Sequence, residues 1–175
     1  MADTRHPAQV IFREEQRFTQ PWLWILLLGG LAAAVGTSLP LVVKFQHRPW
    51  PPGLWLPLVF PAAFMLLIVA LFAFTRLVTE VGTDGIAAAF RPLQTKPRYI
   101  SYSDIAEFRA VTYRPIMEYG GWGIKKGRNG LAYNVSGNRG LLLTLSNGRT
   151  FLVGSQQPER LRAAVDSAVG NRPFG

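Results

Sequence analysis

Side chains that could carry out chemistry are scarce in this chain of 175 residues. It contains no cysteine, which excludes disulfides and thiolate chemistry. The two histidines, His6 and His47, are separated by a long apolar segment. If that segment crosses a membrane, the two imidazoles lie on opposite sides, and one chain cannot join them in a metal site or a catalytic triad. We expect no metal and no cofactor.

The carboxylates offer two candidate catalytic pairs, Asp104 with Glu107 and Glu80 with Glu118. Nothing in the sequence places either pair within the hydrogen-bond reach that general acid–base catalysis needs. Asp104 is better suited to cap a turn through its side chain, and Glu118 to pair with Arg114. We therefore expect that the protein is not an enzyme.

A glycine-rich segment, Tyr119 to Ile124, suggests a nucleotide site only at first sight. The spacing of Gly121, Gly123 and Gly127 does not match G-x-G-x-x-G, and no helix follows whose N-terminus could bind phosphate. We interpret the glycines as structural: they let a bent strand pass close to its neighbour while Trp122 fills the core.

Four cations, Lys125, Lys126, Arg128 and Arg139, fall on two neighbouring glycine-containing turns. Glycines leave backbone N–H groups free to bind anions, so these turns could contact anionic lipid headgroups or a partner. The alternative is a solvated surface without a ligand. We take the four side chains as the predicted contact site.

Two apolar stretches position everything else. Residues 22–45 and 54–75 each reach the roughly 20 residues that a membrane span needs, and a short polar loop joins them. They predict an antiparallel transmembrane hairpin (22–75) between an N-terminal tail (1–21) and a C-terminal domain (76–175). A cleaved signal peptide followed by one anchor is the alternative, but 21 residues before Trp22 make a long leader.

The first span carries small residues at Gly29, Ala33 and Gly36, which fall on one helix face. Such a stripe lets another helix approach closely. The second span of the same hairpin could pack there, or a second copy of the chain could form a homodimer.

The charges next to the spans predict the orientation. Seven cations flank the hairpin on the side of the termini and two lie in its loop. By the positive-inside rule, both termini are cytoplasmic, and we expect a multi-pass protein of a bacterial inner membrane. In the tail, residues 11–18 mix charged and apolar side chains at helical spacing, which predicts an interfacial helix or a segment packed on the domain.

The C-terminal region alternates short apolar runs with turns, which predicts an antiparallel sheet. An irregular pattern near Glu107 predicts a bulge, and Asn147-Gly148 predicts a type I′ hairpin. A helix should begin at Pro158 and bury a stripe that includes Leu161 and Val165. The expected strands are 77–81, 86–91, 98–102, 105–113, 122–125, 131–135, 141–145 and 150–153.

Strands followed by one amphipathic helix are the element order of a pleckstrin-homology-like (PH-like) domain. With "TEVGTDGI", "YRPIMEYGGWGIK", "AYNVSGNRGLLL" and "FLVGSQQPERL", the chain resembles the bacterial two-span membrane proteins with a cytoplasmic PH-like domain. The resemblance covers nearly the whole chain. It implies an α+β membrane protein whose bent antiparallel sheet is capped by a C-terminal helix, and it implies no catalytic residues.

The C-terminal region holds 14 Lys and Arg against seven Asp and Glu, a net charge of +7. Near an anionic leaflet each cation contributes about 1 kcal/mol of attraction. We therefore expect a non-catalytic scaffold or binding module whose partners are the bilayer, anionic headgroups or another membrane protein, and not nucleic acid. The alternative is a regulatory or accessory subunit of a larger membrane enzyme or transporter.

Overall fold

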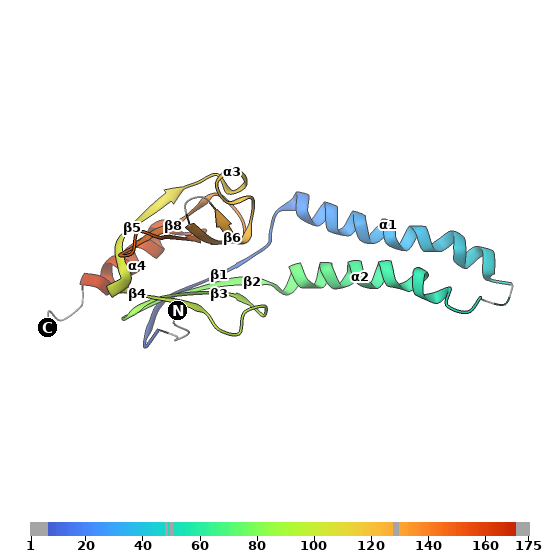
Figure 1. Cartoon of the computed structure of the whole chain (residues 1–175), viewed down its shortest axis with the longest axis horizontal. Helices are drawn as coiled ribbons and strands as arrows, with labels where there is room; N and C mark the ends of the chain where they lie inside the picture. Colours follow the sequence, from blue (N-terminus) through green and yellow to red (C-terminus); the bar gives the residue numbers. More distant parts are fainter. Residues whose placement is uncertain (1–6, 48, 50, 128–129, 171–175) are drawn as a thin grey trace. The chain divides into compact units, whose positions relative to one another are not determined.

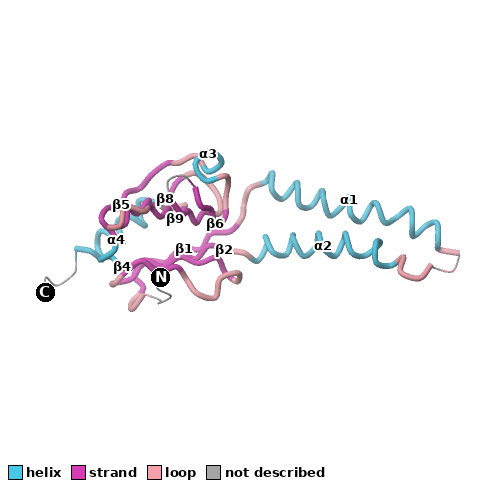
Figure 2. Tube along the Cα trace, viewed as in Figure 1, coloured by secondary structure: helices cyan, strands magenta, loops and turns pink. Residues whose placement is uncertain are grey.

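The structure is a computed structural model that describes residues 7–47, 49, 51–127 and 130–170. It is an α+β protein, shown as a ribbon in Figure 1 and by secondary structure in Figure 2. The chain divides into a helical hairpin, Thr19–Phe74, and a globular unit built from the chain before and after it. The elements in order are β1 (Val10–Arg17), α1 (Pro21–Phe45), α2 (Trp55–Phe74), β2 (Arg76–Gly82), β3 (Gly85–Arg91), β4 (Arg98–Ser101), η1 (Tyr102–Asp104), β5 (Ile105–Thr112), α3 (Pro115–Tyr119), β6 (Gly123–Gly127), β7 (Gly130–Asn134), β8 (Arg139–Leu145), β9 (Thr150–Gly154) and α4 (Pro158–Gly170).

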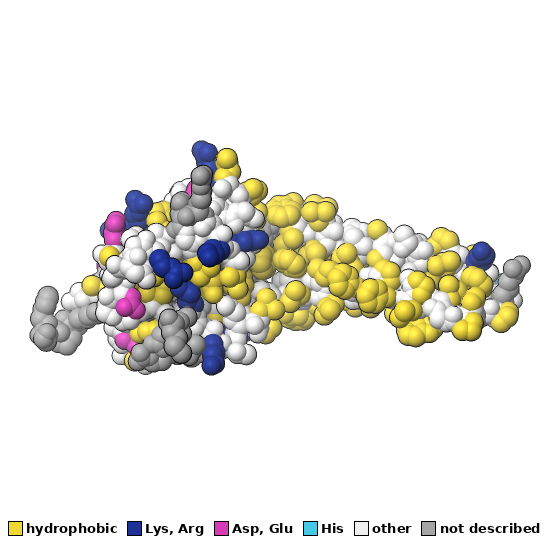
Figure 3. All heavy atoms as spheres, in the orientation of Figure 1, with side chains coloured by type: hydrophobic (Ala, Val, Ile, Leu, Met, Phe, Trp, Pro, Cys, Tyr) yellow, Lys and Arg dark blue, Asp and Glu magenta, His cyan; other side chains and the backbone are white. Residues whose placement is uncertain are grey.

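The hairpin consists of α1 and α2, which agree with the predicted spans to within one residue. Both helices are long and apolar enough to cross a membrane. In the described part of α2 no residue is buried, and hydrophobic side chains cover the visible face of the hairpin in Figure 3. The helices contact each other through Ser38, whose Oγ donates to the Leu58 carbonyl oxygen at 2.9 Å.

The globular unit contains two sheets. The first sheet has the order β1-β2-β3-β4 and is antiparallel throughout. The second sheet has the order β5-β8-β9-β7-β6, in which only the β7–β9 pair is parallel. The hairpin therefore interrupts the first sheet, since it connects β1 to its neighbour β2, whereas the second sheet is built from one continuous segment.

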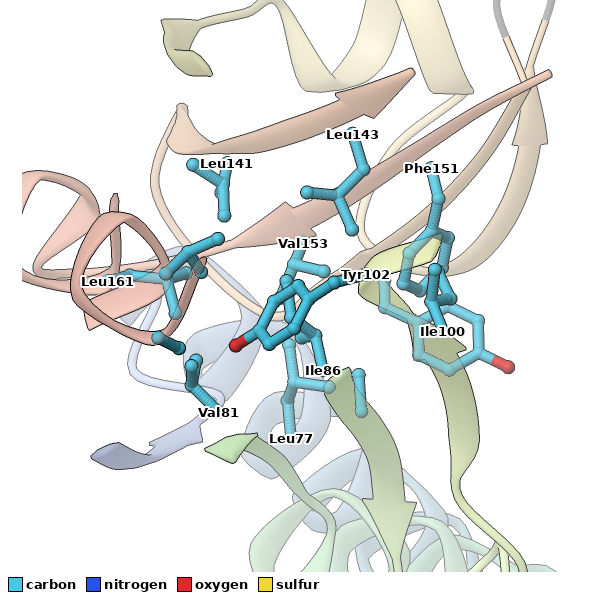
Figure 4. Packing of buried hydrophobic residues seen from close by; sticks show 14 of the residues in the cluster. Leu77, Val81, Ile86, Ile100, Tyr102, Leu141, Leu143, Phe151, Val153 and Leu161 are labelled. Carbon is cyan, nitrogen blue, oxygen red and sulfur yellow. The ribbon is translucent and has the colours of Figure 1, made fainter. Parts of the chain in front are cut away.

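The core lies where both sheets meet α4, and Figure 4 shows its side chains from close by. The first sheet contributes residues such as Leu77 and Ile86, and the second contributes Leu143 and Phe151, all at most 1% exposed. Leu161, Val165 and Ala168 form the buried face of α4. The predicted C-terminal helix and its apolar stripe are thus confirmed.

Strand β1 decides between the two interpretations of the tail: an interfacial helix is wrong, and a segment packed on the domain is confirmed, since Phe12 and Phe18 pack against the core. Residues 10–17 are extended and pair with β2 over nearly their whole length. The side chains alternate along the strand, with Glu14 and Gln16 buried and Arg13, Glu15 and Arg17 exposed. A strand whose inward side chains are polar lacks the apolar alternation that identifies strands, so the sequence pattern was misleading.

Two local predictions have different outcomes. The predicted bulge is confirmed, because the register between β5 and β8 shifts between Ile105 and Glu107. The hairpin at Asn147-Gly148 also forms, since β8 and β9 pair antiparallel. Its turn is not type I′, however: Gly148 has a φ of 76°, but no described non-glycine residue, Asn147 included, has a positive φ. The Asn147 side chain instead accepts a hydrogen bond from the Arg149 N–H.

Candidate functional site

The predicted cation site is not one patch. Lys125 and Lys126 lie within strand β6 and not on a turn, and Arg139 begins β8. Strands β9 and β7 separate β8 from β6, a distance of about 14 Å at the usual strand spacing. Arg139 also has its own partner, since its Nη2 lies 3.6 Å from Oε1 of Glu159. Arg128 lies outside the described residues.

The small residues of α1 do not face α2. A Cβ added to Gly29 or to Gly36 would have no atom within 4 Å, and Ala33 is exposed. Close approach occurs instead at Gly30, where an added Cβ would lie 3.1 Å from Met65 Cε. The interpretation that the stripe packs against the second span is wrong, and a contact with a second copy stays a prediction.

Three arginines stand side by side in the first sheet. Arg17 of β1 pairs in register with Arg76 of β2, and Arg76 pairs with Arg91 of β3. Directly opposed residues of neighbouring strands project from the same face of a sheet. We call Arg17, Arg76 and Arg91 the arginine row. Arg76 and Arg91 also line a depression of about 490 Å³ on that face.

The arginine row is only partly neutralised. Arg76 Nη1 lies 3.1 Å from Glu15 Oε2, and Arg91 Nη1 donates to the carbonyl oxygens of Gln94 and Thr95. In the part of the chain that the structure describes, no carboxylate pairs with Arg17. Like charges directly opposite each other destabilise a sheet, so a bound anion would stabilise this arrangement.

A second basic surface is a cavity of about 830 Å³ at the second sheet. Its lining includes Val111, Leu142 and Leu152, which are apolar, and four cations from separate elements. In Figure 3, Lys and Arg side chains gather beside hydrophobic atoms on the visible face of the globular unit. We call this cavity the basic groove; its cations are Arg98, Arg109, Lys126 and Arg149. Of the predicted cations that the structure describes, only Lys126 lines it.

Two buried tyrosines form one end of the basic groove. Their rings meet edge to face with centroids 5.8 Å apart, and Tyr113 Oη accepts a hydrogen bond from Asn134 Nδ2 at 3.1 Å. Burial raises the pKa of Tyr113 to about 12. Burial, and then the nearby charge of Glu118, also raise the pKa of Tyr119. Both hydroxyls therefore stay neutral at physiological pH.

Of the glycines predicted to allow close strand packing, only Gly127 has a close neighbour: an added Cβ on Gly121 would have no atom within 4 Å, and one on Gly123 would have only Lys125 Cε at 3.9 Å. A Cβ on Gly127 would lie 2.4 Å from the Glu118 carbonyl oxygen, so glycine permits the close approach of β6 to α3. Trp122 does not fill the core: it is half-buried, and its Nε1 donates to the Gly137 carbonyl oxygen at 2.9 Å. Glu118 accepts a hydrogen bond from the Arg114 backbone N–H, not from its guanidinium.

The carboxylates Glu80 and Glu118, considered above as a catalytic pair, lie on different elements. Glu80 lies on β2, with Oε1 3.7 Å from Arg13 Nη1, whereas Glu118 lies on α3. A buried carboxylate that sequence reasoning missed is Glu14, which accepts hydrogen bonds from Ser155 Oγ at 2.6 Å and the Gln156 N–H at 2.7 Å. It ties β1 to the segment before α4.

The arginine row and the basic groove are thus the two candidate sites. Both offer cationic side chains suited to anions. The arginine row belongs to the first sheet, whereas the basic groove is lined mainly by the second sheet, with Arg98 contributed by β4 of the first. Comparison of the chain with protein-family models and with curated proteins finds no match.

Proposed function

We propose that this protein is a non-catalytic binding module anchored in a bacterial inner membrane, with its globular unit held against anionic lipid headgroups. In this proposal α1 and α2 cross the bilayer and both termini are cytoplasmic. The exposed apolar side chains of the hairpin support the first part, because water would hydrate them poorly. The excess of cations on the terminal side supports the second.

The position of the hairpin inside the first sheet carries the proposal. Three residues separate Arg17 from Pro21, and only Thr75 separates Phe74 from Arg76. An extended chain covers at most about 3.6 Å per residue, so Arg17 lies within about 14 Å and Arg76 within about 7 Å of a helix end. If the helices span a membrane, the arginine row must lie near its headgroups.

The energy expected from this placement is modest. Three cations near an anionic leaflet contribute about 3 kcal/mol at about 1 kcal/mol each. Screening over roughly 8 Å at physiological ionic strength makes that figure an upper bound. The attraction therefore orients a unit that the hairpin already anchors.

The proposal includes a PH-like fold for the globular unit. Two sheets that enclose a core with a C-terminal helix are compatible with that fold, and the sequence resemblance points to the same family. Strand β1 would be an addition to the expected set, because it precedes the hairpin in the chain.

The test compares the full chain in detergent micelles with variants that remove or retain the positive charge at Arg17 and Arg76. Phosphatidylglycerol should raise the melting temperature of the parent at low salt, and phosphatidylcholine should not. The variant Arg17→Gln/Arg76→Gln should lose most of this shift, whereas Arg17→Lys/Arg76→Lys should keep it. The variant Lys125→Gln/Lys126→Gln/Arg139→Gln serves as control and should behave like the parent.

Two outcomes would contradict the proposal. If the control triple variant loses the shift while the arginine-row variant keeps it, the cations first predicted from sequence bind the lipid and the row does not. If a reporter fused after Gly175 is active only outside the cytoplasm, the orientation is wrong, and the attraction to the cytoplasmic leaflet does not apply.

A further inference from the structure

We infer that the protein forms a homodimer in which strand β5 pairs edge to edge with β5 of a second copy, antiparallel and in a single register centred on Phe108. The second sheets of the two copies then form one continuous sheet. The inference concerns the second sheet alone, and it depends neither on the arginine row nor on lipid binding.

Strand β5 presents an unpaired backbone edge. It lies at the border of the second sheet, as the yellow arrow in Figure 1, and pairs with β8 alone. The Tyr113 N–H donates to the Asn138 carbonyl oxygen, and this pair continues the β5–β8 register. Since the groups that face a neighbouring strand alternate along an antiparallel ladder, the N–H and C=O groups of Phe108, Ala110 and Thr112 point away from β8. Such an edge can pair with a further strand.

Two opposite charges on β5 are available to a second molecule. Glu107 and Arg109 pair in register with Thr144 and Leu142 of β8. They therefore project from one face of the sheet, opposite to Phe108, which packs against the core. Both side chains are exposed. Among the residues that the structure describes, neither has an oppositely charged group within 4.0 Å.

The spacing of these charges selects a second copy of the same strand. In an antiparallel pair with two-fold symmetry, opposed residues lie on the same face, so the axis passes through a residue. With the axis at Phe108, Glu107 of each copy opposes Arg109 of the other, and two opposite-charge pairs form. An axis at Glu107 or at Arg109 opposes like charges, which destabilises the pairing, and an axis at Ala110 opposes none. The charges therefore fix the register.

The other three edge strands are less suited to pairing with themselves. Strand β6 carries Lys125 and Lys126 but no acidic residue, and β4 has four residues without an acid. In β1, Glu15 is already bound within the chain, 2.6 Å from Arg13 and 3.1 Å from Arg76. Strand β5 thus combines length, unpaired charges and self-complementarity.

The test exchanges charges in the full chain, with detergent micelles in excess over protein and sedimentation velocity as the measurement. Glu107→Arg and Arg109→Glu each oppose like charges, so each should weaken dimer formation by about tenfold or more. A mixture of the two variants should restore the dimer, because both opposed pairs then carry opposite charges. The matched control is Arg149→Glu, which makes the same charge change on the turn between β8 and β9 and should dimerise like the parent.

Cysteine cross-linking tests the register, since the chain has no cysteine of its own. In the inferred dimer, Glu107 and the opposed Arg109 form a non-hydrogen-bonded pair with Cα atoms about 4.5 Å apart, within the range of a disulfide. Glu107 is about 8 Å from its own equivalent, which is too far. A mixture of Glu107→Cys and Arg109→Cys should therefore cross-link on mild oxidation, and neither variant alone should do so.

Several outcomes would overturn the inference. They are a monomeric parent, a dimer that both charge variants retain, and a mixture that fails to restore the dimer. If Gly29→Leu/Gly36→Leu abolishes a dimer that both charge variants retain, the first span holds the copies together and β5 does not. Cross-linking of the single-cysteine variants as strong as that of their mixture would contradict the register.

Discussion

The two sheets of the globular unit share a core but differ in how the chain builds them. The second sheet comes from one continuous segment, β5 to β9, whereas the first sheet combines β1 from before the hairpin with β2 to β4 from after it. Folding of the first sheet therefore requires that two segments separated by 58 residues, Phe18 to Thr75, meet in register. The difference means that the helical hairpin is inserted in the chain between two paired strands of the first sheet, whereas no such insertion interrupts the second.

The largest expected effect comes from removing β1. Deletion of residues 1–17 would expose the edge of β2 and remove Glu14, which holds the segment before α4. We expect the loss to be comparable to the whole stability of a small domain, about 5–15 kcal/mol. Limited proteolysis of the full chain in membranes measures it, and a chain that begins at Pro7 is the control. Equal protection of the two chains would show that β1 is dispensable.

The second-largest loss of stability is expected from a substitution in the core that both sheets share. Leu161 of α4 is fully buried, so Leu161→Ala should lower the free energy of unfolding by about 2–5 kcal/mol through the cavity it leaves. The control Arg162→Ala removes an exposed side chain whose i,i+4 ion pair with Asp166 contributes little. Thermal unfolding of both variants in micelles gives the comparison, and an unchanged melting temperature for Leu161→Ala would mean that α4 does not close the core.

Tyr113, buried beside the second sheet, predicts that the free energy of unfolding depends on pH in the alkaline range. Tyr113 keeps its proton in the folded state up to a pKa of about 12, whereas the unfolded chain loses it near the ordinary value of 10.0. Its contribution to stability is therefore complete below pH 10 and is lost as the pH rises toward 12. Two pH units correspond to about 3 kcal/mol at most.

The variant Tyr113→Phe tests this assignment. It cannot ionise, so its stability should fall less steeply between pH 10 and pH 12 than that of the parent. Tyr119 gives a residual slope of the same sign, because its pKa is raised as well. Denaturant titrations at several pH values measure the slopes. Identical slopes for parent and variant would show that Tyr113 is not the group responsible.

The elements that could be predicted from the sequence are those whose pattern lies within a few neighbouring residues. The spans, α4 and the β8–β9 hairpin follow from uniform apolar runs, a helical stripe and an Asn-Gly turn, all within a few residues. Strand β1 could not be recognised, because its buried Glu14 is matched by Ser155 and Gln156, which lie 141 and 142 residues away.

The candidate sites show the same limit. Arg17, Arg76 and Arg91 are scattered in sequence, and only the pairing of β1, β2 and β3 brings them together. Lys125, Lys126 and Arg139 are close in sequence, but the strand order separates β6 from β8. Closeness along the chain was therefore a poor guide to charge clusters in a sheet of mixed order.

The smallest change in stability is expected when the helical hairpin is replaced by a two-residue turn, which tests whether the first sheet needs the hairpin. Because Arg17 pairs with Arg76, Phe18 and Thr75 stand at the open end of the β1–β2 ladder. Replacing residues 19–74 by Asn-Gly would join the strands through a two-residue hairpin, whose type I′ turn suits the twist of antiparallel strands. We expect a water-soluble globular unit, since the replaced segment contains none of the buried core cluster.

The joined unit should unfold like the same unit in the full chain. Its free energy of unfolding should differ by about 1 kcal/mol or less, as for a surface substitution. The control carries Pro-Pro in place of Asn-Gly: proline holds φ near −65° and cannot provide the positive φ that the turn needs. Dispersed amide signals from the Asn-Gly form but not the Pro-Pro form would show that register between β1 and β2 is sufficient. An unfolded Asn-Gly form would show instead that the first sheet, unlike the second, requires the hairpin to bring its strands together.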